Sequence, residues 1–150
     1  NKSDVDQENE WRLKTGGIAF HTIMEKSKSV TEAVALLDEM AKIDYLIIEL
    51  KKELEKEIKS AYSNEIVHHI LTNSETLTET TIVDDKGKSF RPDKVLIKND
   101  VVQILDFKTG AKKEAHARQL NEYAILFEKL GYKSPKKYLF YTKTEELIAV

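Results

Sequence analysis

The chain has 150 residues, which is enough for one domain with its own hydrophobic core. Its residues are 41% hydrophobic and 33% charged, a balance that argues against wholesale disorder. No apolar run approaches the roughly 18–20 residues of a membrane helix, and the opening residues show no signal-peptide pattern. The sequence has no cysteine, which excludes disulfides, zinc–thiolate sites and iron–sulfur clusters. We expect a cytoplasmic protein that makes no contact with a membrane.

The charge is distributed unevenly along the chain. Residues 1–85 contain 10 Lys and Arg against 18 Asp and Glu, whereas residues 86–150 contain 14 against 8. The basic second part can present an anion-binding face even though the formal net charge of the chain is −2. An ordinary solvated surface gives the same pattern, so charge alone leaves both interpretations open.

The first part of the chain has the apolar spacing of helices. After a polar and frayed start over residues 1–8, helices are predicted over 9–27, 31–43, 45–61 and around 66–70. Thr31 is the expected cap of the second helix. The expected core positions are Trp11, Ile18, Met24, Val34, Leu37, Ile43, Leu46, Leu50, Leu54 and Ile58.

The pair Gly16–Gly17 lies inside the first predicted helix, where each glycine costs about 1 kcal/mol. The pair therefore indicates either the true start of that helix or the close approach of another segment. Near residue 71 the apolar pattern changes to alternation, which is typical of strands. In chain order the predicted elements are strands 77–83, 90–97 and 101–107, a helix over 113–130 with Leu120, Ala124 and Phe127 inward, and strands 137–142 and 147–150.

Two aspartates are predicted to face each other on neighbouring strands. A two-residue turn at residues 99–100 places Asp93 directly opposite Asp106, with Cβ atoms roughly 4.5–5.5 Å apart. Like charges at that distance repel unless a cation lies between them, and oxygen ligands suit Mg²⁺ or Mn²⁺. Lys108 projects from the same face as Asp106. Two carboxylates, a metal-activated water and an ammonium make a workable phosphodiester hydrolysis site.

An ordinary interpretation of the same residues exists. Asn-Asp is a weaker hairpin signal than Asn-Gly, and a slip of one residue would put the aspartates on opposite faces. Asp93 would then be an edge residue after a proline, Asp106 the end of a strand, and Lys108 a solvated neighbour. Spacing alone leaves the choice open.

Four motifs stand in order along the chain: Gly17-x-x-x-His21, Arg91-Pro92-Asp93-Lys94-Val95, Leu105-Asp106-Phe107-Lys108-Thr109-Gly110 and Gln119-Leu120-x-x-Tyr123. This series resembles the RecB-like branch of the PD-(D/E)XK nuclease superfamily, the nuclease domain of RecBCD- and AddAB-type helicase–nucleases. The resemblance is dense from Phe90 to Thr142 and sparse before it. Many relatives carry four cysteines around an iron–sulfur cluster, so this chain resembles the cluster-free members.

The resemblance implies a role for each motif residue. Lys108 would position the attacking water and stabilise charge growing on the phosphate, while Gln119 and Tyr123 would orient the lysine or the phosphate. A histidine ligand would allow Mn²⁺ as well as Mg²⁺. The implied metal ligands are His21, Asp93, Asp106 and the backbone carbonyl of Phe107.

Each of these residues also has a purely structural interpretation. His21 can be a helix histidine whose hydrogen bonds go to neighbours such as Glu25. Gln119 and Tyr123 can simply border the apolar stripe of the predicted helix over 113–130. Glu79 falls where the branch often has an acidic residue. The candidate DNA-backbone contacts are Lys112, Lys113, Arg118, Lys136 and Lys137. The histidines that match no motif, expected to be structural or exposed, are His68, His69 and His116.

The expected fold is a restriction-endonuclease-like α/β domain, with a mixed β-sheet flanked by helices and an N-terminal helical segment. Residues 1–72 would be the helical part with the histidine motif, and residues 73–150 a β-β-β-α-β catalytic core. The expected activity is that of a Mg²⁺- or Mn²⁺-dependent deoxyribonuclease, an exonuclease rather than an endonuclease.

The expected partners are DNA, as a single strand or unwound end, and a helicase in cis or in trans, in double-strand-break repair and recombination. The chain opens without methionine and has no P-loop, so we expect an excised module whose motor lies elsewhere. One alternative is a catalytically silent DNA-binding or docking module. Another is an acid–base enzyme that uses Asp93 and Asp106 without metal.

Overall fold

Four consecutive helices form the first half of the chain in the computed structural model, which describes residues 3–150. They are α1 (Asp4–Lys26), α2 (Val30–Ile43), α3 (Tyr45–Ser63) and α4 (Glu65–Thr72). Each follows a short polar residue whose side chain accepts a hydrogen bond from a backbone N–H of the first turn. These capping residues are Ser3, Ser29, Asp44 and Asn64.

Several details of the predicted helices are wrong. The chain does not fray over residues 4–8, because Ser3 caps a helix that begins at Asp4; residues 1 and 2 lie outside the described part. The cap of α2 is Ser29, whose hydroxyl accepts from the N–H of Glu32. The predicted core residues Ile18 and Ile43 are 60% and 90% exposed. The remaining departures are Leu46, which is exposed, and Trp11 and Val34, which are only partly buried.

The second half of the chain forms a mixed five-stranded sheet in the order β1-β4-β5-β6-β7. Helix α5 (Glu114–Lys129) connects β5 to β6, the parallel pair, and the other neighbours are antiparallel. The strands are β1 (Leu77–Thr78), β4 (Lys94–Lys98), β5 (Val101–Lys108), β6 (Lys136–Tyr141) and β7 (Glu146–Ala149). A separate two-stranded sheet pairs β2 (Ile82–Val83) with β3 (Ser89–Phe90). The predicted mixed α/β architecture is confirmed.

Two predicted strands are each interrupted. The segment 77–83 divides into β1 and β2, because Glu79 takes a positive φ of 44° and turns the chain out of the sheet. The segment 90–97 divides into β3 and β4 around Pro92, which has no N–H to donate to a strand ladder. Asp93 therefore lies just before β4.

The hairpin of β4 and β5 has the predicted register. Lys98 pairs with Val101 and Lys94 with Leu105, so position 93 stands opposite position 106. Asn99 and Asp100 have φ values of 52° and 63°, the left-handed conformation that a two-residue type I′ turn requires at both positions. The turn length thus sets which side chains meet at the far end of the hairpin.

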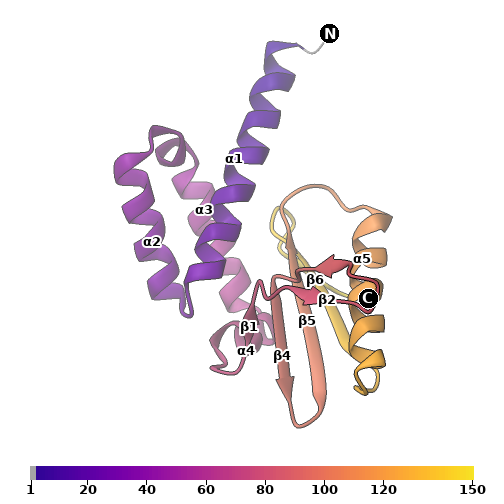
Figure 1. The fold of residues 1–150 in the computed structure, drawn as a ribbon. Coiled ribbons are helices and arrows are strands. Elements are labelled where there is room, and N and C mark those ends of the chain that lie inside the picture. The colour runs from indigo at the N-terminus through magenta and orange to yellow at the C-terminus, as the bar shows by residue number, and fades with distance from the viewer. Residues whose placement is uncertain (1–2) are drawn as a thin grey trace.

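The sheet separates two hydrophobic clusters. Helices α1–α4 cover one face and α5 covers the other (Figure 1). Along β5, Leu105 and Phe107 face the four-helix side, while Val102 and Ile104 face α5. Alternation places Asp106 on the α5 side with the latter two. Within residues 3–150, every helix is too short or too polar to span a lipid bilayer.

The left-handed turn gives a test of the hairpin. We expect Asp100→Gly to stabilise the fold by about 0.5 kcal/mol, because glycine takes a positive φ without a Cβ penalty. Asp100→Ala should lose about 1 kcal/mol for the opposite reason. Urea denaturation followed by circular dichroism measures both values. Equal stability of the two variants would contradict the assigned turn.

Candidate active site

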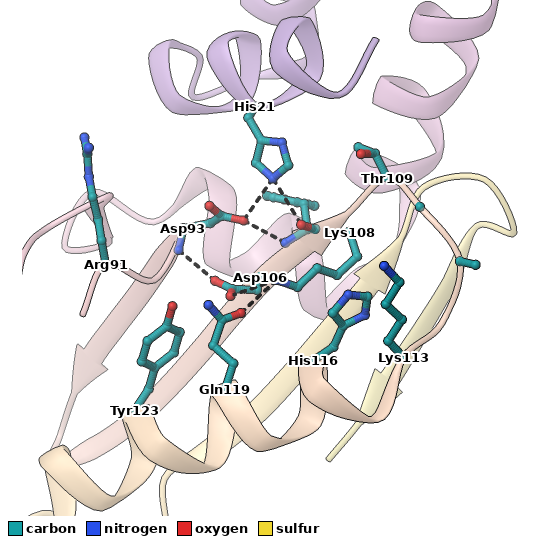
Figure 2. A pocket seen from close by; sticks show the side chains of 13 residues that line it. His21, Arg91, Asp93, Asp106, Lys108, Thr109, Lys113, His116, Gln119 and Tyr123 are labelled. Atoms are coloured by element: carbon teal, nitrogen blue, oxygen red, sulfur yellow. Dashed lines mark hydrogen bonds and ion pairs between the residues drawn. The ribbon is translucent and has the colours of Figure 1, made fainter. Parts of the chain in front are cut away.

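A cavity of about 380 Å³ lies where the end of β5 meets α1 and α5. Figure 2 shows side chains from both helices and from the hairpin converging on it. The lining residues are His21, Arg91, Asp93, Asp106, Phe107, Lys108, Thr109, Gly110, Ala111, Lys113, His116, Gln119 and Tyr123. Every residue for which the motifs predicted a central role is among them.

Two crossed hydrogen bonds join Asp93 and Asp106, and in each of them one carboxylate accepts from a backbone N–H of the other segment. The N–H of Asp93 donates to Oδ1 of Asp106 at 2.8 Å, and the N–H of Phe107 donates to Oδ2 of Asp93 at 2.8 Å. Backbone donors of this kind stabilise an ionised carboxylate. Asp106 is 4% exposed, and burial, followed by the charge of Asp93, raises its pKa to about 6. The predicted pairing of the two aspartates is therefore present, and it concentrates negative charge.

His21 lies against this carboxylate pair. Its Nδ1 is 2.9 Å from the carbonyl of Gly17, and its Nε2 is 3.1 Å from the carbonyl of Phe107 and 3.4 Å from Oδ2 of Asp93. Carbonyl oxygens only accept, so both ring nitrogens donate and the ring is an imidazolium. The hydrogen bond to Asp93 is the main reason that the pKa of His21 is raised to about 9.

Lys108 lies on the other side of Asp106. Its ammonium is 3.8 Å from Oδ2 of Asp106 and donates to Oε1 of Gln119 at 2.8 Å (Figure 2). Tyr123 follows Gln119 by one turn of α5 and lines the same cavity, where burial raises the pKa of its hydroxyl. Gln119 therefore orients the lysine, while Tyr123 forms part of the wall.

Gly17 explains how α1 reaches the site. A Cβ at position 17 would lie 2.8 Å from Oγ1 of Thr109, whereas a Cβ at Gly16 would be 3.8 Å from Leu50, an ordinary contact. Of the two interpretations of the glycine pair, close approach is correct, and the helix starts well before it. The histidine motif and the Thr109-containing motif are thus in direct contact.

The donor set around His21 fits a hard divalent cation. Nε2 of His21, which must release its proton to bind a metal, converges with Oδ2 of Asp93 and the Phe107 carbonyl, and Asp106 adds a second buried carboxylate. Mutual repulsion of the carboxylates is what such a cation would relieve. Within residues 3–150, however, no three acidic or histidine side chains are arranged to hold a metal ion as they stand. Of the two carboxylate oxygens of Asp106, Oδ1 accepts from the Asp93 N–H and Oδ2 is 3.8 Å from the Lys108 ammonium.

The weaker predictions separate into residues inside and outside the cavity. Lys113 lines it. Glu79 does not: its carboxylate pairs with Arg91 at 2.9 Å. Lys112 pairs with Glu146, and Arg118 pairs with Glu114 across an exposed helix turn. The lysines at 136 and 137 lie on β6, outside the cavity, and Lys137 donates to Asn121.

Two lining residues were missed or misjudged from the sequence. His116, expected to be structural or exposed, lines the cavity and hydrogen-bonds the hydroxyl of Tyr141 at 2.9 Å. Arg91 also lines the cavity, although the sequence predicts no role for it beyond its place in a motif. The spacing of 116, 119 and 123 on one helix face was the signal that could have found the histidine. His68 and His69 are exposed, as predicted.

Neither known protein families nor curated proteins give a match to this chain. The assignment of a function therefore rests on the residues and their geometry.

The contact at Gly17 can be tested with a pair of matched variants. We expect Gly16→Ala to stabilise the fold by about 0.5–1 kcal/mol, because alanine favours a helix interior. Gly17→Ala should lose that gain to the clash with Thr109, and Thr109→Ala should restore it. Thermal unfolding of these three variants and of the double variant Gly17→Ala/Thr109→Ala measures the effects. Equal gains from both glycine substitutions would show that α1 does not press on Thr109.

Proposed function

We propose that this chain is a metal-dependent deoxyribonuclease with the restriction-endonuclease-like fold of the RecB-like branch. The observation that carries the proposal is the pair of carboxylates, Asp93 and Asp106, held together by crossed backbone hydrogen bonds with the Lys108 ammonium 3.8 Å from one of them. Carboxylates and a lysine at one cavity are the groups that phosphodiester hydrolysis requires.

The residues that would hold the cation are His21, Asp93, Asp106 and the Phe107 carbonyl. Bound Mg²⁺ or Mn²⁺ supplies Lewis acidity and a water of lowered pKa. The protein's own contribution is to fix the carboxylates through strand register and to bring in His21 through the close approach of α1. No other described segment has to be added to complete this set.

In this proposal Lys108 holds the attacking water and balances charge on the phosphate. Its side chain is 20% exposed, so the ammonium is largely shielded from bulk water. Its electrostatic effect is stronger in such a shielded position than in water. Gln119 fixes its orientation at 2.8 Å. A preorganised cation of this kind stabilises the transition state without reorganising during the reaction.

The cationic groups of the cavity favour a nucleic-acid substrate. Arg91, Lys113 and Lys108 all line it, and non-specific DNA binding is largely phosphate neutralisation. Within this proposal the chain acts as an exonuclease module at DNA ends that a helicase, in cis or in trans, unwinds during repair and recombination. The docking-module alternative gives no reason for two carboxylates to be held together at this point.

Replacing the lysine tests the chemical step. We expect Lys108→Ala to reduce cleavage of end-labelled DNA about 100-fold or more in Mg²⁺ or Mn²⁺, because the group that balances transition-state charge is lost. Binding of DNA in EDTA should weaken far less than cleavage, because Arg91 and Lys113 still line the cavity. Lys52→Ala, an exposed lysine on α3, is the matched control. Near-normal cleavage by Lys108→Ala would remove this residue from the mechanism.

Calorimetry with Mn²⁺ tests the cation. We expect the wild type to bind Mn²⁺, and Asp106→Asn and His21→Ala to weaken binding at least tenfold, a loss of about 1.4 kcal/mol. Asparagine keeps an acceptor for the N–H of Asp93, so the fold should survive, which thermal unfolding checks. Glu146→Gln is the control.

Activity that survives EDTA would instead support a metal-free acid–base enzyme, and binding of DNA without any cleavage would support a docking module.

A further inference from the structure

His116 is a polar side chain of the cavity to which the proposed cleavage mechanism gives no role. It lies in the first turn of α5, three residues before Gln119, and faces the same cavity. Its Nδ1 is held by the hydroxyl of Tyr141 at 2.9 Å, and the two rings are 5.7 Å apart. Tyr141 is 4% exposed, so the group that orients the histidine is itself fixed in the core.

The second ring nitrogen of His116 is free to meet a ligand. In residues 3–150, Nε2 has no hydrogen-bond partner, whereas both nitrogens of His21 are engaged. Burial, followed by the charges of Lys108 and Lys113, lowers the pKa of His116, which favours the neutral ring. When the Tyr141 hydroxyl donates to Nδ1, the proton of the neutral ring sits on Nε2 and is available to an anion.

Lys113 offers a second unused donor beside it. The carbonyl of Lys113 accepts a hydrogen bond from the N–H of His116, and its ammonium acts electrostatically on the histidine. Among the described residues this ammonium has no carboxylate partner, in contrast to Lys112, which pairs with Glu146. Figure 2 shows Lys113 and His116 next to each other, on the side of the cavity away from His21.

We propose that His116 and Lys113 form a subsite for a phosphodiester group that neighbours the one being cleaved. The subsite rests on the proposed nuclease function and narrows its substrate class to a nucleic-acid strand with at least two phosphates. A neutral imidazole N–H and an ammonium are both donors to phosphate oxygens. In Figure 2, Lys108 lies between this subsite and Asp106, so a strand crossing the cavity would present successive phosphates to the two places.

Tyr141 is a positioning residue in this arrangement. It hydrogen-bonds His116 without itself lining the cavity. Removing its hydroxyl frees the ring to rotate and to take the other tautomer. The effects of Tyr141→Phe and His116→Ala should therefore not add, since each removes the same oriented N–H.

Two substrates separate the subsite from the chemistry. We expect His116→Ala to raise the KM for a single-stranded oligonucleotide about tenfold with little change in kcat, as one hydrogen bond to a charged group is lost. For a substrate with a single phosphodiester, such as thymidine 5′-(p-nitrophenyl phosphate), the variant should match wild type. Tyr141→Phe should shift the oligonucleotide KM in the same direction. His69→Ala is the matched control.

Binding in EDTA, measured by fluorescence anisotropy with a labelled oligonucleotide, needs no catalysis. Lys113→Ala should reduce the slope of log affinity against log salt by about 1, whereas His116→Ala should weaken binding without changing the slope, because the ring is neutral. Lys52→Ala controls for loss of a surface lysine. Weakened binding in the variants supports the subsite even if wild type proves unable to cleave, a result that would defeat only the nuclease proposal.

The subsite is overturned by any of three results. One is unchanged oligonucleotide affinity in both His116→Ala and Lys113→Ala. Another is an equal loss on the single-phosphodiester substrate, which would place His116 at the cleaved phosphate or in the core. The third is absence of oligonucleotide binding by the wild type in EDTA together with absence of cleavage.

Discussion

The contact on which the rest of this structure depends is the pair of crossed hydrogen bonds between Asp93 and the strand of Asp106. Two carboxylates that face each other across a hairpin repel, and burial of Asp106 adds to the cost. The backbone N–H groups of Asp93 and Phe107 offset part of that cost. Two cationic groups offset the rest, His21 from α1 on one side and Lys108 from β5 on the other.

The position of this pair at the end of the hairpin explains the arrangement of the helices. Helices α1 and α5 cover opposite faces of the sheet, so they can reach a common point only where the strands end (Figure 1). Gly17 lets α1 approach Thr109, just beyond β5. On the other face, Gln119 of α5 accepts a hydrogen bond at 2.8 Å from Lys108, the lysine that follows Asp106 by two residues. The site therefore lies at the end of the strands because only there can side chains from the two helix layers meet.

Much of the site was predictable because local rules determine it. A two-residue turn fixes register, and register fixes that Asp93 meets Asp106, while alternation fixes the side of Lys108. Contacts between distant segments were not predictable: nothing near Gly17 in the sequence identifies Thr109 as its neighbour. The exposure of Ile18 and Ile43 has the same origin, since a helix pattern shows a stripe but not which residues at its margin another element covers.

The two negative charges of Asp93 and Asp106 distinguish the proposed catalytic site from a docking module that only retains the fold. An asparagine at position 106 would accept the hydrogen bond from the Asp93 N–H as well as an aspartate does, and it would remove the repulsion. A module that only binds or docks would thus be more stable with one amide and one acid. A sequence that keeps both acids, buries one, and surrounds them with His21 and Lys108 carries a local conflict, and such conflicts are typical of functional sites. Under the proposed function this conflict has a use, because a cation and a phosphate that entered the cavity would both meet charges already in place.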